Sequence, residues 1–201
     1  MEGKRSSPPS SRPILERPVG FDRRARRTTL LLLPALSGAA GLLLWALAAT
    51  WPSDGAADSV AVFLIVALSC LPGLALIASC VVWCWRQSPR SLRLDGAQLT
   101  LRRGGRPLVL PLALIAAVFP FPSGSPGCRV FGSDGFLGYL GLFSNRSLGQ
   151  YTAFIGNRHE AFCVRTTHGR TYALSCADAP AMMRAIAATC GLPVPAAPPE
   201  N

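Results

Sequence analysis

Two uncharged stretches decide the fold of this chain: Leu30–Trp51, LLLLPALSGAAGLLLWALAATW, and Val60–Trp85, VAVFLIVALSCLPGLALIASCVVWCW. At 1.5 Å per residue, roughly 20 helical residues cross a hydrocarbon core of about 30 Å, so each stretch is long enough to span a bilayer. Trp51 and Trp85 end the two stretches, where amphipathic rings suit the membrane interface. We therefore expect two transmembrane helices, at about residues 30–51 and 60–85 of a helical segment covering residues 28–88.

The charged residues beside these stretches predict the orientation of the chain. The connecting segment contains Asp54 and Asp58 and no basic residue. Arginines precede the first stretch and follow the second: Arg23, Arg24, Arg26, Arg27, Arg86 and Arg90. By the positive-inside rule, we expect a multi-pass protein of the plasma membrane with both termini in the cytoplasm.

One alternative concerns the first stretch. Basic residues, an apolar run and Ala46-Leu47-Ala48 together resemble a signal peptide with its cleavage site. Even then, the second stretch would hold the following domain in the cytoplasm. Within the first stretch, Ser37 and Gly41 lie four residues apart, and we interpret them as the contact between the two helices.

The composition of the chain indicates which partners and which kinds of site to expect. The net charge is +10, which nucleic acid and membrane surfaces both attract. Because the basic residues adjoin the apolar stretches, we expect the lipid bilayer as a partner and no nucleic acid. The seven cysteines form no paired pattern, which argues against a disulfide framework and a zinc site and for a reducing compartment. We expect no metal and no cofactor. Residues 1–27 and the Pro-rich residues 193–201 are predicted to be disordered tails.

Residues 89–192 have the pattern of a small β-domain. Short apolar runs alternate with Gly-rich turns, and Arg102-Arg103-Gly104-Gly105-Arg106 predicts a hairpin turn after a strand ending near Arg103. Ala179–Cys190 is expected to form a helix, capped by Ser175 or Asp178 and ended by Gly191. Further strands are predicted at Leu108–Leu110, Ile115–Phe121, Cys128–Phe131, Leu142-Phe143, Gln150–Phe154, Phe162–Thr166 and Thr171–Leu174. This order favours an all-β sandwich or partly open barrel that the final helix covers.

A family resemblance adds to this prediction. The stretch Arg129–Phe143, RVFGSDGFLGYLGLF, together with Leu148–Tyr151 and Gly169–Ser175, resembles the bacterial pleckstrin-homology-like (PH-like) domains that follow a pair of transmembrane helices. The resemblance covers roughly Leu92–Ala188 and implies a seven-stranded sandwich with a C-terminal capping helix. It implies no established catalysis.

Two motifs raise the question of catalysis or nucleotide binding. Gly132, Gly135, Gly138 and Gly141 recur every three residues, but no helix follows them as in a dinucleotide-binding loop, so we interpret them as turns and bulges. Cys163 would need His159 or His168 as a base to act as a nucleophile, and it lies in an apolar strand. We therefore expect a protein that is not an enzyme.

The arginines near the predicted hairpin are the candidate contact site: Arg102, Arg103, Arg106, Arg86 and Arg90. A guanidinium fork fits phosphate oxygens, and each arginine near an anionic membrane contributes about 1 kcal/mol. The leading hypothesis is a membrane-anchored binding or scaffold module with an unidentified protein partner. The alternative is a sensor of anionic lipid head groups that uses the arginine hairpin.

Overall fold

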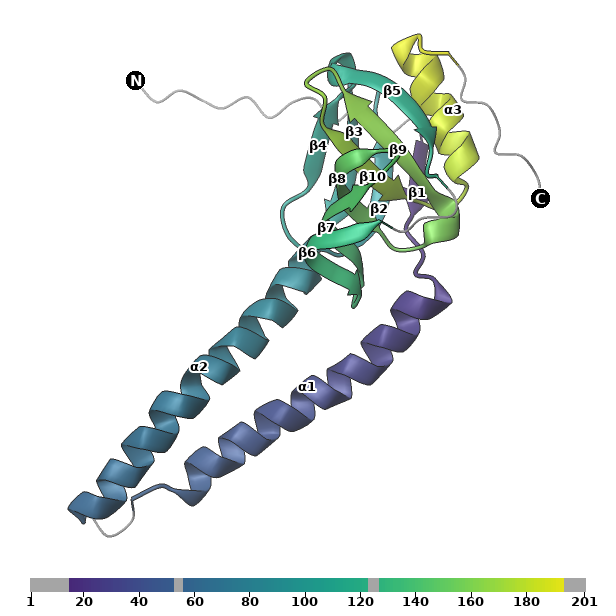
Figure 1. Cartoon of the computed structure of the whole chain (residues 1–201). Coiled ribbons are helices and arrows are strands. Elements are labelled where there is room, and N and C mark those ends of the chain that lie inside the picture. Colours follow the sequence, from purple (N-terminus) through teal and green to yellow (C-terminus); the bar gives the residue numbers. More distant parts are fainter. Residues whose placement is uncertain (1–14, 53–55, 123–126, 194–201) are drawn as a thin grey trace, which may run out of the picture.

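The computed structural model describes residues 15–52, 56–122 and 127–193. Two long helices, α1 (Arg23–Ala49) and α2 (Ala57–Gln87), extend side by side from one end of a β-domain and diverge as they approach it (Figure 1). Both are long and apolar enough to cross a membrane. The helices predicted at residues 30–51 and 60–85 are confirmed, and each begins earlier than the apolar run alone indicated.

The β-domain consists of two sheets. The first has the strand order β1-β2-β3-β4 and the second the order β5-β9-β10-β8-β7-β6. The strands of the first sheet are β1 (Leu15–Pro18), β2 (Pro89–Leu94), β3 (Gln98–Arg103) and β4 (Leu108–Pro111). Those of the second are β5 (Ile115–Pro120), β6 (Cys128–Gly135), β7 (Gly138–Asn145), β8 (Gly149–Ile155), β9 (Ala161–Thr166) and β10 (Thr171–Ser175). Short 3₁₀ turns lie at Leu112–Leu114 and Arg158–Glu160. In the described residues the sheets form no closed barrel.

The final helix, α3 (Ala179–Cys190), covers one side of this domain beside β5 (Figure 1). The predicted bounds are confirmed. Asp178 is the N-cap and accepts a hydrogen bond from the Ala181 N–H, whereas Ser175 accepts one from the Gly156 N–H. Gly191 ends the helix in the left-handed conformation, with a φ of 65°.

Apolar side chains from both sheets and α3 make the main core. In β2 and β3 the leucines occupy every second position, and all of them point inward, as a half-buried strand requires. Fully or almost fully buried members of this core include Leu92, Leu94, Leu99, Leu101, Leu140, Phe162, Val164, Leu174, Met182 and Ile186. A second cluster, with Tyr139, Phe143 and Tyr151 among its members, lies on the second sheet and includes Ala25 of α1.

The prediction that residues 1–27 form a disordered tail is wrong for residues 15–27; residues 1–14 lie outside the described part. Leu15–Pro18 pairs with β2 in antiparallel register, and the Val19 N–H continues the contact to the Arg90 carbonyl. The helical hairpin is therefore an insertion between two neighbouring strands. A four-residue edge strand carries too little apolar periodicity to be found from sequence, because its stability comes from pairing with residues more than 70 positions away.

Two features of the sheets have no counterpart among the predicted strands. The segment from Leu92 to Arg103 contains a hairpin turn, because β2 ends at Leu94 and the Asp95 N–H bonds the Gln98 carbonyl. Asp-Gly is a strong turn signal, and here it outweighs the alternation on either side. The second sheet is also not wholly antiparallel, since β10 runs parallel to β8.

The two helices contact each other through α2's Gly73, where an added Cβ would lie 3.4 Å from Leu43 Cδ1. The predicted contact at Ser37 and Gly41 is wrong: Ser37 is exposed, and a Cβ at Gly41 would meet nothing within 4 Å. Most other side chains of both helices are exposed. Only 11% of the most apolar window of α2, and none of that of α1, is buried. A core helix of a soluble protein would be mostly buried.

Candidate functional site

The β6–β7 hairpin is the element of the β-domain that contacts α1. Glycines occur at paired positions of this hairpin, and Gly132 and Gly141 face each other. Their φ angles are 120° and 112°, and a Cβ on Gly132 would lie 1.9 Å from the Leu140 carbonyl oxygen. The interpretation of the repeated glycines as turns and bulges holds for Gly135 and Gly138, which flank the turn at the tip. It is wrong for Gly132 and Gly141, which pair inside the two strands in a geometry that only glycine adopts without strain.

The tip of this hairpin bonds the first turns of α1. The Leu137 N–H donates a hydrogen bond to Thr29 Oγ1 at 2.9 Å. A Cβ on Gly135 would lie only 3.2 Å from Thr28 Oγ1, so the backbone of the tip lies directly against the helix. The tip of the Gly-rich segment therefore fixes the β-domain on α1.

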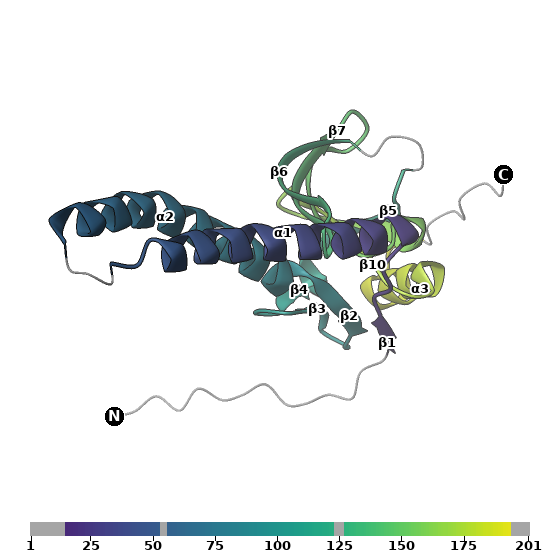
Figure 2. The same ribbon diagram turned by 90° about the horizontal axis from the view of Figure 1, so that it is seen from below.

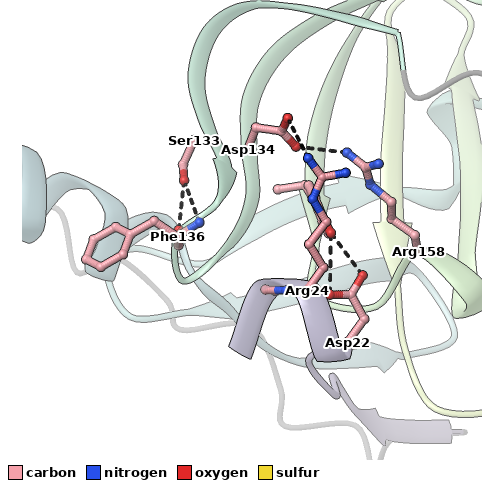
Figure 3. Close-up of polar contacts among 8 residues, drawn as sticks. Asp22, Arg24, Ser133, Asp134, Phe136 and Arg158 are labelled. Carbon is pink, nitrogen blue, oxygen red and sulfur yellow. Dashed lines mark hydrogen bonds and ion pairs between the residues drawn. The ribbon is translucent and has the colours of Figure 1, made fainter. Parts of the chain in front are cut away.

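A ring of polar contacts beside this tip joins α1 to the domain a second time. The Asp22 carboxylate accepts hydrogen bonds from the Ala25 N–H at 2.7 Å and from the Tyr139 hydroxyl at 3.1 Å. The Arg158 guanidinium lies 3.8 Å from the Tyr139 ring centroid and donates to Asp134 at 2.9 Å. Arg24 reaches the same carboxylate at 3.8 Å, so Asp134 lies between two arginines (Figure 3). We call this set the junction cluster: Asp22, Arg24, Asp134, Tyr139 and Arg158.

Electrostatics keeps Tyr139 protonated in the junction cluster. Burial raises the pKa of Tyr139 to about 12; the nearby Asp22 carboxylate raises it as well, and the Arg158 guanidinium opposes both. The hydroxyl therefore acts as a permanent donor to Asp22 at physiological pH. The cluster borders a cavity of about 520 Å³. The cluster could not be found from the sequence, because Asp22 and Arg24 lie more than 100 residues from its other members. The one local signal was Asp22, which stands three residues before Ala25 as a helix cap requires.

The predicted arginine hairpin lies against the end of α2. Its turn is fixed by backbone bonds from the Gly104 N–H to the Ser88 carbonyl and from the Gly105 N–H to the Arg86 carbonyl. A Cβ on Gly104 would lie 2.1 Å from the Trp85 carbonyl oxygen. The hairpin turn is thereby placed where the apolar part of α2 ends.

The individual arginines of the candidate site differ in role. Arg103 bonds the Gln87 side chain and the Arg106 carbonyl, and its guanidinium lies 4.9 Å from the Phe154 ring centroid. Burial lowers the pKa of Arg103. Because its guanidinium is engaged in these contacts, this residue stabilises the turn rather than offering a fork for phosphate. Arg102 lies 3.9 Å from Glu16, and Arg90 lies over Trp85. Arg86 and Arg106 are exposed. The end of α2 and the turn thus bring together four of the five arginines: Arg86, Arg90, Arg103 and Arg106. Of these, Arg86 and Arg106 have no acidic or aromatic partner among the described residues and remain available to a ligand.

The start of β6 adds an apolar surface next to α2. Val130 and Phe131 are 54% and 65% exposed, and the Phe131 ring meets Trp83 edge-on at 5.5 Å between centroids. Seen from the helix side, β6 and β7 lie on one side of the helices and β2–β4 on the other (Figure 2). The domain therefore presents apolar and basic side chains together at the level where the helices leave it.

Cys163, the one cysteine considered as a nucleophile, is fully buried, whereas His159 and His168 are exposed. Burial raises the pKa of Cys163 to about 12, so the side chain is a thiol and not a thiolate at neutral pH. Within the described ranges, no group of three His, Cys, Asp or Glu side chains is placed to hold a metal ion.

In three comparisons with known proteins, no family model, no curated protein and no solved structure matched this chain. The resemblance to PH-like domains therefore stays a prediction. The strand count of the domain also differs from the seven that the resemblance implied, since the described chain forms ten strands in two sheets.

Proposed function

We propose that this protein is a membrane-anchored, non-catalytic binding module. α1 and α2 span the plasma membrane, and a PH-like β-domain presents a protein-binding surface on the cytoplasmic side. The observation that carries the proposal is the insertion of an exposed apolar helical hairpin between two paired strands, β1 and β2, with arginines at both of its domain ends.

This insertion supports a topology in which the segments before α1 and after α2 lie on the same side of the membrane. Because β1 pairs with β2, the residues before α1 and after α2 belong to one folded body, which lies on one side of the membrane. The positive-inside rule makes that side the cytoplasm. The contacts of α1 with Tyr139 and Leu137 also favour an intact chain over a cleaved signal peptide, since cleavage would remove a strand and the junction cluster.

The arginines at the start of α1 support an anionic surface nearby. Arg23, Arg24, Arg26 and Arg27 lie in the first turns of α1, where the helix dipole disfavours positive charge. Arg24 pairs with Asp134, whereas Arg26 and Arg27 are exposed. Because Arg26 and Arg27 lower the stability of the helix itself, we explain them by an interaction outside the protein. Anionic lipid head groups at the end of a membrane span supply that interaction.

The edge of the first sheet is the best candidate for the protein-binding surface. The Gly-rich tip and the hairpin turn both contact helices, and α3 packs on β5. β4 is the last strand of its sheet and exposes Val109 by 43%. An extended segment of a partner that adds to such an edge gains main-chain hydrogen bonds.

The second candidate function, sensing of anionic lipid, is favoured by one observation: the turn that carries Arg106 is bonded to the end of α2. Arg90 and Arg102 are exposed but contact Trp85 and Glu16, whereas the exposed Arg86 and Arg106 have no acidic or aromatic partner among the described residues. Contact through these last two residues gives attraction without head-group selection. This attraction weakens with salt, whereas strand addition at β4 does not.

A photo-reactive amino acid at Val109, in the full-length protein expressed in cells, tests the binding proposal. We expect a discrete cross-linked species that persists at high salt and in an Arg86→Ala/Arg106→Ala variant. The same amino acid at Arg170, an exposed position in the turn between β9 and β10, is the matched control and is expected to give no such species. Equal, salt-sensitive labelling at both positions would support the lipid alternative instead.

A further inference from the structure

An apolar groove lies between the two helices where the β-domain meets them. It has a volume of about 550 Å³ and is lined by Leu32 and Leu36 of α1, by Ser79–Cys84 of α2 except Val82, and by β6 with Phe136. This volume lies within the range of about 300–1,000 Å³ typical of ligand sites.

The groove contains one charged side chain. Among the described residues, the Arg129 guanidinium makes no ion pair and no hydrogen bond, although it borders the groove. The hydroxyl of Ser133, which also lines the groove, is satisfied by the backbone of Phe136, with distances of 2.9 Å to the carbonyl and 3.0 Å to the N–H (Figure 3). The groove is therefore apolar with an unpaired cation at its side.

The depth of the groove places it in one leaflet. Ser79–Cys84 precedes Trp85 and Arg86, where the apolar part of α2 ends, and extends about 8 Å along the helix at 1.5 Å per residue. Leu32 and Leu36 lie within three turns of the arginines that begin α1. The groove is thus long enough for the part of an acyl chain nearest the head group, and Arg129 borders it from the start of β6.

We infer that this groove binds one anionic phospholipid of the surrounding leaflet, with an acyl chain between α1 and α2 and its phosphate at Arg129. The inference rests on the proposal that the helices span a membrane. It is separate from the arginine hairpin, because Arg129 belongs to β6 and the hairpin turn contacts α2 through Trp85 and Arg86. Charge complementarity selects the occupant: a neutral lipid leaves the guanidinium unpaired, and a soluble anion leaves the apolar walls uncovered.

Trp83 lines the groove and serves as the reporter. The full-length protein, with its other three tryptophans changed to Phe, is reconstituted in nanodiscs of neutral lipid. Phosphatidylglycerol or phosphatidylcholine, brominated near the head-group end of the acyl chain, is then added at equal mole fraction. We expect the apparent affinity from Trp83 quenching to favour phosphatidylglycerol about fivefold, the factor that corresponds to about 1 kcal/mol per arginine near anionic lipid.

Three variants sharpen the test. Arg129→Gln is expected to abolish the preference, whereas Arg170→Gln, an equal charge change in an exposed turn between β9 and β10, keeps it. Ser79→Phe places a ring in the groove at an exposed position and is expected to weaken quenching by phosphatidylglycerol. Unchanged circular dichroism and elution volume show that each variant is folded.

The outcomes separate this inference from the proposed function. Equal quenching by both lipids overturns the anionic site and leaves the membrane anchor intact. Loss of the preference on adding soluble glycerol phosphate overturns it too, since the site would then be one for free phosphate. No quenching by either lipid places Trp83 outside the bilayer and contradicts the anchor itself.

Discussion

Substitution of Asp22 by Ala is expected to release the start of α1 from the β-domain. The carboxylate caps the helix through the Ala25 N–H, and loss of such a cap costs about 1 kcal/mol. It also accepts a hydrogen bond from Tyr139, and bonds to charged groups contribute about 1.5 kcal/mol or more. Because both contributions involve one carboxylate and are not fully additive, we take their joint cost as about 2 kcal/mol, which raises the undocked population about thirtyfold.

Trypsin measures this undocking directly, because the first turns of α1 contain Arg23, Arg24, Arg26 and Arg27. Cleavage of a transiently open segment follows the population of its open form when opening is fast. We therefore expect cleavage within Arg23–Arg27 of the detergent-solubilised protein, followed by mass spectrometry, to accelerate about thirtyfold in Asp22→Ala.

Two controls make this result specific to the junction cluster. Asp22→Asn keeps a capping oxygen and an acceptor for Tyr139, so cleavage should accelerate much less. In a double-mutant cycle with Tyr139→Phe, the two effects should be less than additive, because they remove the same hydrogen bond. Cleavage of Asp22→Ala at the wild-type rate would show that the Asp22 carboxylate does not hold α1 on the β-domain.

Three further predictions concern stability, each measured by unfolding of the full-length protein in detergent. Gly132→Ala should cost at least about 3 kcal/mol because its φ is 120° and its Cβ would clash with a carbonyl, whereas Gly149→Ala, in open space at a φ of 68°, should cost about 1 kcal/mol. Arg103→Ala should cost about 2 kcal/mol through the lost contacts with Gln87 and a buried ring, and Arg102→Ala less than about 1 kcal/mol; equal losses would contradict the assigned roles. Stability should fall as the pH rises from 9 toward 12, because the Cys163 thiol ionises near 9.0 when unfolded but only near 12 when folded; Cys163→Ala should flatten this fall.

Local signals in the sequence were sufficient for the helices. The two spans follow from the length of uncharged runs, and α3 follows from an Asp cap, a Pro in the first turn and a terminal Gly. Most strands were also located, because alternation and Gly-rich turns are local as well. Their lengths were underestimated where glycines fill the strand, as at Gly132 and Gly141, since a pattern of apolar side chains is absent there.

Features that depend on distant pairing were not predictable from the sequence. β1 is a strand only because β2 lies beside it, and the parallel pairing of β8 with β10 has no local signature. The junction cluster joins Asp22 to Tyr139 across 117 positions. Likewise, the hairpin arginines were found by composition, but only their contacts with Gln87 and Phe154 distinguish a structural arginine from an available one.

Cysteine accessibility in intact and permeabilised cells tests the central claim most directly. Exposed Cys80 and Cys128 are first replaced by Ser, and a single Cys is then placed at Ala57, at the start of α2, or at Arg170, in the β-domain. An impermeant maleimide is expected to label Ala57→Cys in intact cells and Arg170→Cys only after permeabilisation. Labelling of Arg170→Cys in intact cells would contradict the central claim, because the β-domain would then face outward.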